Sequence, residues 1–336
     1  MAACAILRPM PPIPVLTVPP GAEPAVWSLS AEPERLALLV RSARRTYTPI
    51  GVRLADAATR SWAARSASPY AAAVSAVDRA MGQPGGHLLN HSYEWGCTTA
   101  AIADPAQGGA TLARTLDWPF HGLGQALVVT RCEGEAGPYL SVTWPGVVGV
   151  LTALAPGRFA AAINQPPLPL PGWGRAAGWI GARGRVSRSR ALSPTHLLRL
   201  AFDTCRSFAD AVELVRRTPV CIPAIITLAG CHADEAVTLE RTAEGAHVPA
   251  HAVAANHWTA PGSPPGRPRN PSSAGRHAAM SRLAGAHPSW DFGWLQPPIL
   301  QPDTRVAVLA NPRTGRLMAQ GWEATGAVTT VLDMAG

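Results

Sequence analysis

Apolar and polar residues follow two different patterns along the chain, and the pattern changes near residue 97. Between residues 32 and 81, apolar residues such as Leu36 and Leu39 recur at helical spacing and lead into a run of arginines. A second, alanine-rich helical stretch over residues 69–81 stops at a Gln-Pro-Gly-Gly sequence. The first 25 residues are rich in proline, which predicts an extended segment. We therefore expect a mostly helical unit before residue 97.

From Cys97 onward, short apolar runs alternate with turns that contain Gly and Pro, a pattern typical of antiparallel hairpins. Ser193-Pro194 and Ser207 are start signals for helices over residues 194–204 and 208–217, and a shorter helix is expected over 276–284. Strands, then two helices, then strands predict an α+β fold of two sheets with helical layers outside them. The predicted strands cover residues 97–103, 111–118, 126–131, 139–144, 147–154, 158–164, 222–228, 237–241, 247–255, 305–310 and 316–322.

The composition suits a globular protein with a large core. Of the 336 residues, 47% are apolar and 15% are charged. No apolar run is long enough for a membrane helix, since the longest candidate, residues 142–155, is interrupted by Pro145 and two glycines. The first residues lack the pattern of a secretory signal, so we expect a cytoplasmic protein. The six cysteines lack C-x-x-C spacing and predict free thiols.

The net charge of +8 comes from arginine, because the chain contains no lysine. This excludes a Schiff-base lysine, a Ser–Lys dyad and a phosphate-loop lysine. The basic residues are spread along the chain without interleaved aromatic residues, so nucleic-acid binding is not expected. One arginine-rich segment, residues 173–190, predicts either a solvated loop or a rim that contacts a membrane surface transiently.

Cys97 is the candidate nucleophile because of the residues on either side of it. A lone cysteine is most often a small buried apolar residue, but here Gly96 precedes it and Thr98 and Thr99 predict a strand after it. A strand offers no helix dipole to lower the pKa of the thiol. The α-amino group of Cys97, with a pKa of roughly 7.7–8.0, would serve as a base if the Gly96–Cys97 bond were cut. Glycine suits such a cleavage site because it tolerates strained backbone conformations.

Several motifs around Cys97 occur together in a known group of hydrolases. They are N-H-S-Y-E-W-G-C-T-T at 90–99, A-R-T-L-D-W at 113–118, T-W-P-G-V-V-G-V-L-T-A-L-A-P-G-R-F at 143–159, A-I-N-Q at 162–165 and A-N-H-W at 255–258. With these motifs, collinear over residues 14–322, the chain resembles the acid ceramidase and N-acylethanolamine acid amidase family. It is more distantly similar to bile-salt hydrolases and penicillin V acylases. The resemblance implies a four-layer αββα sandwich and a nucleophile that becomes an N-terminus by self-cleavage.

The resemblance also implies roles for individual residues. Cys97 matches the nucleophile, Asp117 the aspartate that holds its amine, and Arg114 the arginine that orients nucleophile and substrate carbonyl; the alternative for the last two is a surface ion pair. Asn256 matches the asparagine of the oxyanion hole, and Asn164 matches a further active-site asparagine; for each of the two, a turn asparagine is the alternative.

A late arginine of the family has no unambiguous match, because the proline-rich segment before it departs from the family pattern. Arg276 is the preferred candidate, and Arg267 and Arg269 remain alternatives. The spacing of His247 and His251 suits a metal pair, but Pro249 between them indicates a strand, so no metal is expected.

The implied substrate is a linear fatty-acyl amide, such as an N-acylethanolamine or a ceramide-like lipid, hydrolysed without metal or cofactor. Trp95, Trp144 and Val147 are candidates for walls of an acyl pocket. Residues 1–96 would form an N-terminal subunit that stays associated with the catalytic domain, residues 97–336, after cleavage.

Three alternatives remain open from the sequence. The same scaffold could transfer the acyl group to an amine and not to water. The chain could also stay uncleaved and act as a lipid-binding module. A Cys–His hydrolase that uses His121, His232 or His257 is the third.

Overall fold

The computed structural model describes residues 10–91, 95–169, 189–242, 245–264, 266–268, 272–286 and 288–335. Its helices are α1 (Pro24–Ala31), α2 (Pro33–Ala63), α3 (Ala71–Met81), α4 (Gly86–His91), α6 (Pro194–Thr204), α7 (Phe208–Arg217) and α8 (Ser273–Ala286).

Most strands belong to one of two large sheets. In the first sheet the order is β1-β4-β5-β6-β7-β9-β10-β11, with strands β1 (Val15–Thr17), β4 (Val128–Gly134), β5 (Gly137–Thr143), β6 (Thr152–Ala155), β7 (Phe159–Asn164), β9 (Ala224–Gly230), β10 (Ala236–Arg241) and β11 (Ala246–His247). In the second the order is β12-β2-β3-β14-β15-β16, with strands β12 (Val253–Ala254), β2 (Gly96–Ala103), β3 (Ala110–Asp117), β14 (Thr304–Asn311), β15 (Arg316–Glu323) and β16 (Gly326–Ala327), while β17 (Leu332–Met334) also pairs with β15. A short ladder joins β8 (Leu168–Pro169) to β13 (Gly266–Arg267).

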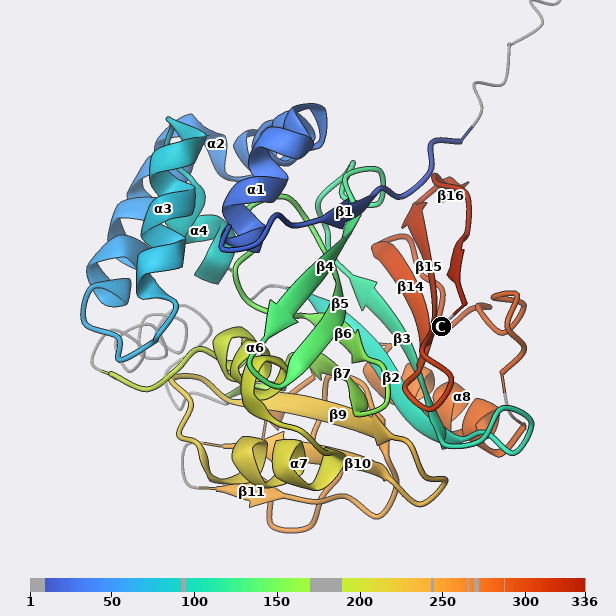
Figure 1. The fold of residues 1–336 in the computed structure, drawn as a ribbon. Helices are drawn as coiled ribbons and strands as arrows, with labels where there is room; N and C mark the ends of the chain where they lie inside the picture. The colour runs from blue at the N-terminus through green and yellow to red at the C-terminus, as the bar shows by residue number, and fades with distance from the viewer. Residues whose placement is uncertain are drawn as a thin grey trace, which may run out of the picture.

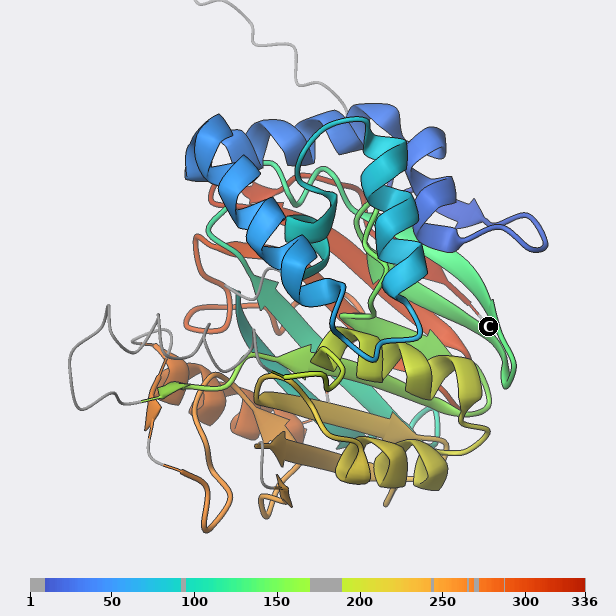
Figure 2. The ribbon, with the colours of Figure 1, turned by 90° about the vertical axis from the view of Figure 1, so that its left-hand side faces the viewer.

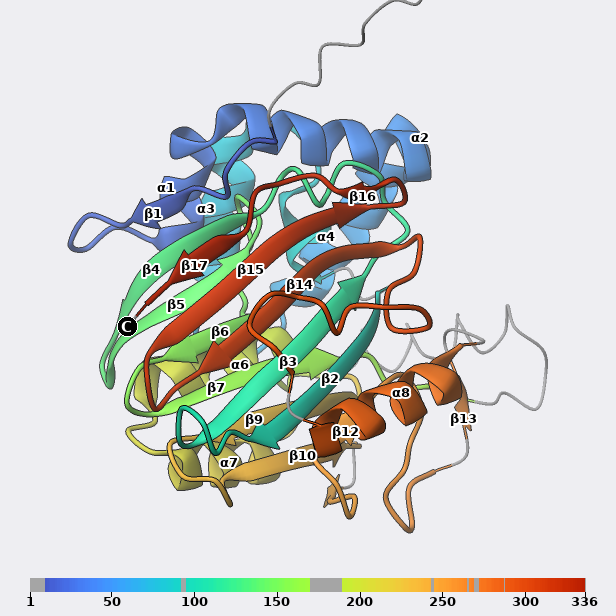
Figure 3. The ribbon, with the colours of Figure 1, turned by 90° about the vertical axis from the view of Figure 1, so that its right-hand side faces the viewer.

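The two large sheets pack face to face, and helices cover part of each outer face (Figures 1 and 3). Apolar residues of the segment 290–300 also pack on the outer face of the second sheet. Helices α6 and α7 lie on the outside of the first sheet, and α8 lies across β2 and β12 on the outside of the second. The central strands β3, β9 and β14 are buried along their whole length because both of their faces are covered. This arrangement confirms the predicted α+β fold of two mostly antiparallel sheets between helical layers.

Helices α1 to α4 form a cluster at one end of the sandwich, beside α6 (Figure 2). The chain before them joins the first sheet, where β1 pairs in parallel with β4. Arg199 of α6 donates to both carboxylate oxygens of Glu23, just before α1, at 2.7 and 3.1 Å. Residues on both sides of position 97 therefore share one sheet and a partly buried ion pair.

Ser193 and Ser207 act as the predicted helix caps, since their hydroxyls accept the backbone N–H groups of His196 and Asp210. The structure also differs from the predictions in several places. Helices α1 and α4 are not predicted, because α1 falls in the proline-rich start and α4 is a short helix before the Cys97 motif.

The predicted strand over 147–154 is wrong in its first half, since β6 begins only at Thr152. The backbone N–H groups of Val148 and Val150 donate instead to the Asn90 side chain and to the Thr195 carbonyl. These partners leave no ladder for a strand to join.

The predicted strand over 247–255 is also wrong as one element. Its two ends, β11 and β12, lie in different sheets, where they pair with β10 and β2. Pro249 lies in the crossing and has no N–H to donate to a ladder.

Candidate active site

Cys97 lies at the start of β2, which pairs antiparallel with β3. The register places Gly96 opposite Asp117 and Thr99 opposite Arg114. Side chains alternate between the faces of a strand, so Cys97, Thr99 and Arg114 face the other sheet, whereas Asp117 shares the opposite face with Thr98, toward α8. The three-residue spacing of Arg114 and Asp117 thus puts them on opposite sides of the sheet.

On the inner face, the Cys97 thiol lies against a guanidinium group. Arg114 Nη2 is 3.3 Å from Cys97 Sγ and donates to the Ile163 carbonyl at 3.1 Å, while Nη1 donates to Thr152 Oγ1. The thiol is fully buried. Burial raises its pKa, Arg114 and Arg276 act to lower it, and Asp117 adds to the increase.

The backbone nitrogen of Cys97 is held separately from the thiol. It donates to Asn256 Oδ1 at 2.9 Å, and Arg276 Nη2 donates to the same oxygen at 2.8 Å. Two donors on one atom identify it as the oxygen of the amide. The amide nitrogen of Asn256 therefore points the other way, where it donates to the Gln165 carbonyl at 2.8 Å.

On the outer face, Asp117 and Arg276 form a buried pair at 3.6 Å. Arg276 Nη1 also donates to the Cys97 carbonyl and, at 2.7 Å, to Thr98 Oγ1. Asp117 accepts from Gln301 Nε2 at 2.5 Å and from Thr304 Oγ1 at 2.8 Å. Burial raises the pKa of Asp117, and the charge of Arg276 and these hydrogen bonds oppose the increase.

Asn164, at the end of β7, connects the two sheets beside the site. Its Oδ1 accepts from Thr99 Oγ1 at 2.6 Å, and its Nδ2 donates to the Ala255 carbonyl at 3.2 Å. Ala255 directly precedes Asn256, so Asn164 supports the segment that carries Asn256, whose side-chain oxygen accepts from the Cys97 nitrogen.

The structure thus brings together the candidates Cys97, Arg114, Asp117, Asn164, Asn256 and Arg276. Of the alternative arginines, Arg269 and the side chain of Arg267 lie outside the described residues. Among the described histidines, none is hydrogen-bonded to the Cys97 thiol: His121 is 81% exposed, His232 is exposed, and His257 bonds to Ser273. The arrangement gives no support to a Cys–His pair.

Several supporting residues were not found from the sequence. Thr152 holds Arg114, Gln301 and Thr304 hold Asp117, and Ser273 holds the backbone of Asn256. Thr304, for example, lies 187 positions along the chain from Asp117. No local pattern in the sequence marks these supporting residues.

An apolar pocket of about 710 Å³ lies between the N-terminal helices and the ends of the sheets. Trp144, one of the predicted pocket walls, lines it together with Trp118. Trp118 follows Asp117 in the chain, and its ring lies 5.2 Å from the ring of buried Trp95 and 5.6 Å from that of Trp144. The three rings therefore run from the neighbourhood of Cys97 to this pocket. The other residues that line the apolar pocket are Leu36, Leu39, Val40, Ser42, Ala43, Arg44, Tyr47, Val52, Met81, Pro84, Gly85, Leu88, Leu89, Phe120 and Leu123.

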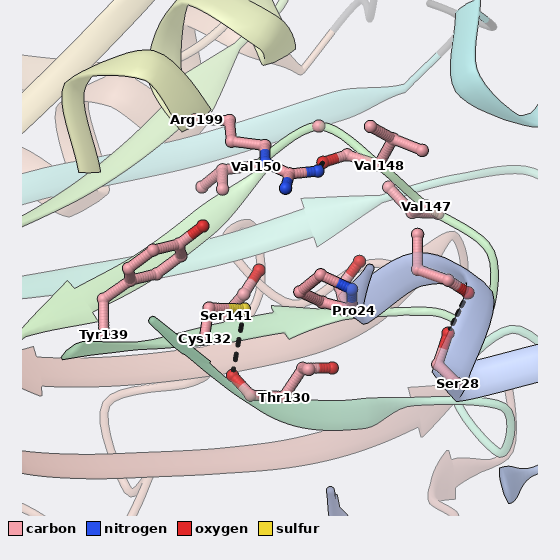
Figure 4. A pocket seen from close by; sticks show the side chains of 13 residues that line it. Pro24, Ser28, Thr130, Cys132, Tyr139, Ser141, Val147, Val148, Val150 and Arg199 are labelled. Carbon is pink, nitrogen blue, oxygen red and sulfur yellow. Dashed lines mark hydrogen bonds between the residues drawn. The ribbon is translucent and has the colours of Figure 1, made fainter. Parts of the chain in front are cut away.

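Val147, the third predicted wall, lines a different cavity of about 320 Å³ between α1 and the first sheet (Figure 4). This cavity is partly polar, with the hydroxyls of Thr130, Ser141 and Thr143 and the side chain of Arg199 among its walls. Cys97 lines neither this cavity nor the apolar pocket.

Across the described ranges, no helix is long and apolar enough to cross a bilayer, and no group of three or more His, Cys, Asp or Glu side chains is placed to hold a metal ion. The described cysteines are Cys97, Cys132, Cys205, Cys221 and Cys231, and all are free thiols. Most of the arginine-rich segment over 173–190 lies outside the described residues, which resume at Ser189.

No protein-family model and no curated protein sequence matches the chain. Among solved structures, it is similar to an N-acylethanolamine-hydrolyzing acid amidase ortholog from Caenorhabditis elegans, with 16% identity and a TM-score of 0.47 over 65% of this chain and 93% of that one. Penicillin V acylase from Agrobacterium tumefaciens has 15% identity and a TM-score of 0.44 over 71% and 86% of the two chains. A mutant conjugated bile acid hydrolase from Clostridium perfringens has 10% identity and a TM-score of 0.43 over 71% and 92%. These are kinds of protein that the sequence motifs resemble.

Proposed function

We propose that the chain is a self-processing cysteine amidase whose nucleophile is Cys97. The observation that carries the proposal is that two atoms of Cys97, its sulfur and its backbone nitrogen, have different hydrogen-bond partners. The thiol lies 3.3 Å from Arg114 on one face of the sheet, while the nitrogen of the same residue is held by Asn256 at 2.9 Å. A catalytic residue that supplies both nucleophile and base needs this arrangement.

In the proposed processing step, the Cys97 sulfur attacks the carbonyl carbon of Gly96. The C–N bond breaks, the nitrogen of Cys97 takes up a proton and becomes an amine, and a thioester joins Gly96 to the sulfur. Water then hydrolyses the thioester and releases the carboxylate of Gly96 and the thiol of Cys97. Fragments 1–96 and 97–336 are the products. The thiol and the carbonyl that it attacks belong to adjacent residues of one chain, so the first step is intramolecular.

The mature site would use the new amine as the general base for the thiol. Asp117 lies next to the position of Gly96, since a methyl group added to that glycine would come within 3.5 Å of Asp117 Oδ2. We assign Asp117 to hold the amine, with its charge balanced by Arg276. Arg114 favours the thiolate electrostatically. The Asn256 amide would donate to the oxyanion, an interaction of a kind often worth about 3 kcal/mol.

Turnover then follows the usual order for covalent catalysis. The thiolate attacks the substrate carbonyl, the amine product leaves with a proton, and water hydrolyses the acyl-enzyme. For the acyl part we propose a fatty chain, because the resemblance of the motifs implies it and because the pocket beside Trp118 and Trp144 is almost wholly apolar. The arginine-rich segment over 173–190 stays a candidate for transient membrane contact.

The test is hydrolysis of a panel of N-acylethanolamines and ceramides of different chain length by purified wild-type protein and by Cys97→Ala. We expect free fatty acid from the wild type alone, together with a C-terminal fragment that carries the mass of one acyl group during turnover. Addition of a primary amine distinguishes acyl transfer, which would yield a new amide. Binding of the lipids without any product in the wild type would contradict the amidase and favour a lipid-binding module.

A further inference from the structure

The first turn of α8 holds Asn256 at two points. The backbone N–H of Asn256 donates to Ser273 Oγ at 2.8 Å, and Arg276 Nη2 donates to its side-chain oxygen at 2.8 Å. Ser273 and Arg276 are three residues apart and so share one face of the helix. Ser272, just before the helix, accepts from Arg276 Nε at 3.2 Å. The position of Asn256 therefore depends on how α8 begins.

His257 adds a second contact to this turn. Its Nδ1 lies 2.8 Å from Ser273 Oγ. In the part of the chain that the structure describes, Ser273 Oγ has two partners, the Asn256 N–H and this ring nitrogen. A hydroxyl oxygen can accept more than once, and we assign the arrangement that satisfies both groups: the oxygen accepts from the N–H and donates its own hydrogen to Nδ1. That geometry requires a neutral ring with its hydrogen on Nε2.

The surroundings of His257 favour the neutral ring. Burial lowers the pKa of His257, and the neighbouring His277 and Arg276 on α8 lower it further, against the opposing charge of Glu240 on β10. The rings of His257 and His277 lie 5.3 Å apart. Ser273 is fully buried, so loss of the ring nitrogen would remove a hydrogen-bond partner from a hydroxyl that bulk solvent does not reach.

We propose that His257 and Ser273 are positioning residues of the amidase: their hydrogen bonds fix Asn256 so that it can hold the Cys97 nitrogen and face the reacting carbonyl. Neither residue contacts the thiol. The inference rests on the proposed function, since it gives Asn256 its role in the oxyanion site. In this proposal His257, the residue after Asn256, acts through Ser273 of α8, a role that the motifs of the family do not indicate.

Substitutions separate positioning from simple stability. In Ser273→Ala and in His257→Phe we expect kcat to fall about 10-fold to 100-fold, because small displacements of a catalytic group cost this much, with KM nearly unchanged. His257→Asn is the conservative variant, since its Oδ1 takes the place of Nδ1 as acceptor, and should recover most of kcat. Ser281→Ala is the matched control: it removes a hydroxyl of the same helix that donates to the His277 carbonyl and not to His257 or Asn256, and it should leave kcat unchanged.

Nitrogen NMR of protein labelled at histidine provides a readout that does not depend on turnover. We expect His257 Nδ1 to be unprotonated and hydrogen-bonded at neutral pH, and this signal to change in Ser273→Ala. An active wild type whose kcat survives both Ser273→Ala and His257→Phe would overturn this inference alone. A wild type that hydrolyses no amide would overturn the proposed function and the inference together.

Discussion

The thiol of Cys97 is subject to opposing influences on its pKa. Burial raises the pKa, and the largest effect in the other direction comes from Arg114, whose Nη2 lies 3.3 Å from the sulfur. Without a histidine on the thiol in the described structure, this guanidinium and the amine made by cleavage are the groups that would generate the thiolate. Arg114 should therefore matter more to reactivity than to folding.

The variant Arg114→Gln tests whether Arg114 stabilises the thiolate of Cys97. We expect kcat/KM to fall about 100-fold, or about 2.7 kcal/mol, because the thiolate loses its neighbouring cation. The pH at which thiolate absorbance appears should move upward. Arg316→Gln is the control, since Arg316 pairs with Asp333 on a distant strand. An unchanged thiol titration in Arg114→Gln would show that Arg114 does not stabilise the thiolate.

Short motifs in the sequence predicted the candidate residues of the site, but they did not predict the residues that hydrogen-bond to these candidates. Cys97, Arg114 and Asp117 lie in short motifs on two paired strands, so a local pattern carries them. Gln301 and Thr304 reach Asp117 from the other end of the chain, and Ser273 reaches Asn256 through the start of a helix. Such contacts depend on tertiary packing, which the spacing of residues along a chain does not encode.

At the scale of elements, strands with clear turns and helices with serine caps were predicted correctly, as α6, α7, β14 and β15 illustrate. Errors occur where tertiary partners replace local ones. The sequence of residues 147–151 predicts a strand, but backbone N–H groups of this segment donate to the Asn90 side chain and to a carbonyl of α6. A methyl group on Gly149 would lie 2.6 Å from Thr195 Cβ, which shows how closely α6 approaches.

In the contact between α4 and α6, the ring of partly buried His91 lies 5.4 Å from that of buried His196, measured between centroids. Burial lowers the pKa of His91, and it lowers the pKa of His196 from 6.5 to about 3. His196 Nδ1 bonds to Ser68 Oγ at 2.8 Å, whereas neither ring nitrogen of His91 has a hydrogen-bond partner in the described structure. Both rings are therefore neutral in the folded chain.

This contact predicts a loss of stability in acid. The unfolded chain binds a proton at each histidine below about pH 6.5, while the folded chain does not until far lower pH. The free energy of unfolding should be at its full value above pH 6.5 and decrease as the pH falls toward 3, by about 1.4 kcal/mol per pH unit for His196, and His91 should add to the decrease.

Denaturant titrations from pH 7 to pH 4 measure this slope. His196→Asn retains an acceptor for Ser68 and removes the titrating ring, so its slope should be smaller than that of the wild type. His232→Asn, at an exposed position, should retain the wild-type slope. Equal slopes in all three proteins would contradict the role assigned to His196.

At the scale of the whole molecule, residues before and after position 97 are interleaved. Strand β1 lies in the first sheet beside β4, and Glu23 pairs with Arg199 across the boundary. The apolar pocket is lined by α2 from one side and by Trp118 and Trp144 from the other. An acyl pocket of this kind needs both proposed fragments.

We therefore expect fragments 1–96 and 97–336 to elute together in size-exclusion chromatography after cleavage, also at high salt. High salt screens exposed charges, but strand pairing and buried apolar contacts persist. Arg199→Met removes the pairing with Glu23 and should weaken the association. Separate elution of the wild-type fragments under native conditions would contradict a shared pocket.

We propose that Cys97 cuts the chain before itself and then acts as the nucleophile. Intact mass spectrometry of the purified protein beside Cys97→Ala tests it most directly. We predict two wild-type fragments that divide between Gly96 and Cys97, and a Cys97→Ala chain that stays whole. A wild type that remains a single chain after prolonged incubation at acidic and neutral pH would contradict the account, because Cys97 would then have no α-amino group to serve as its base.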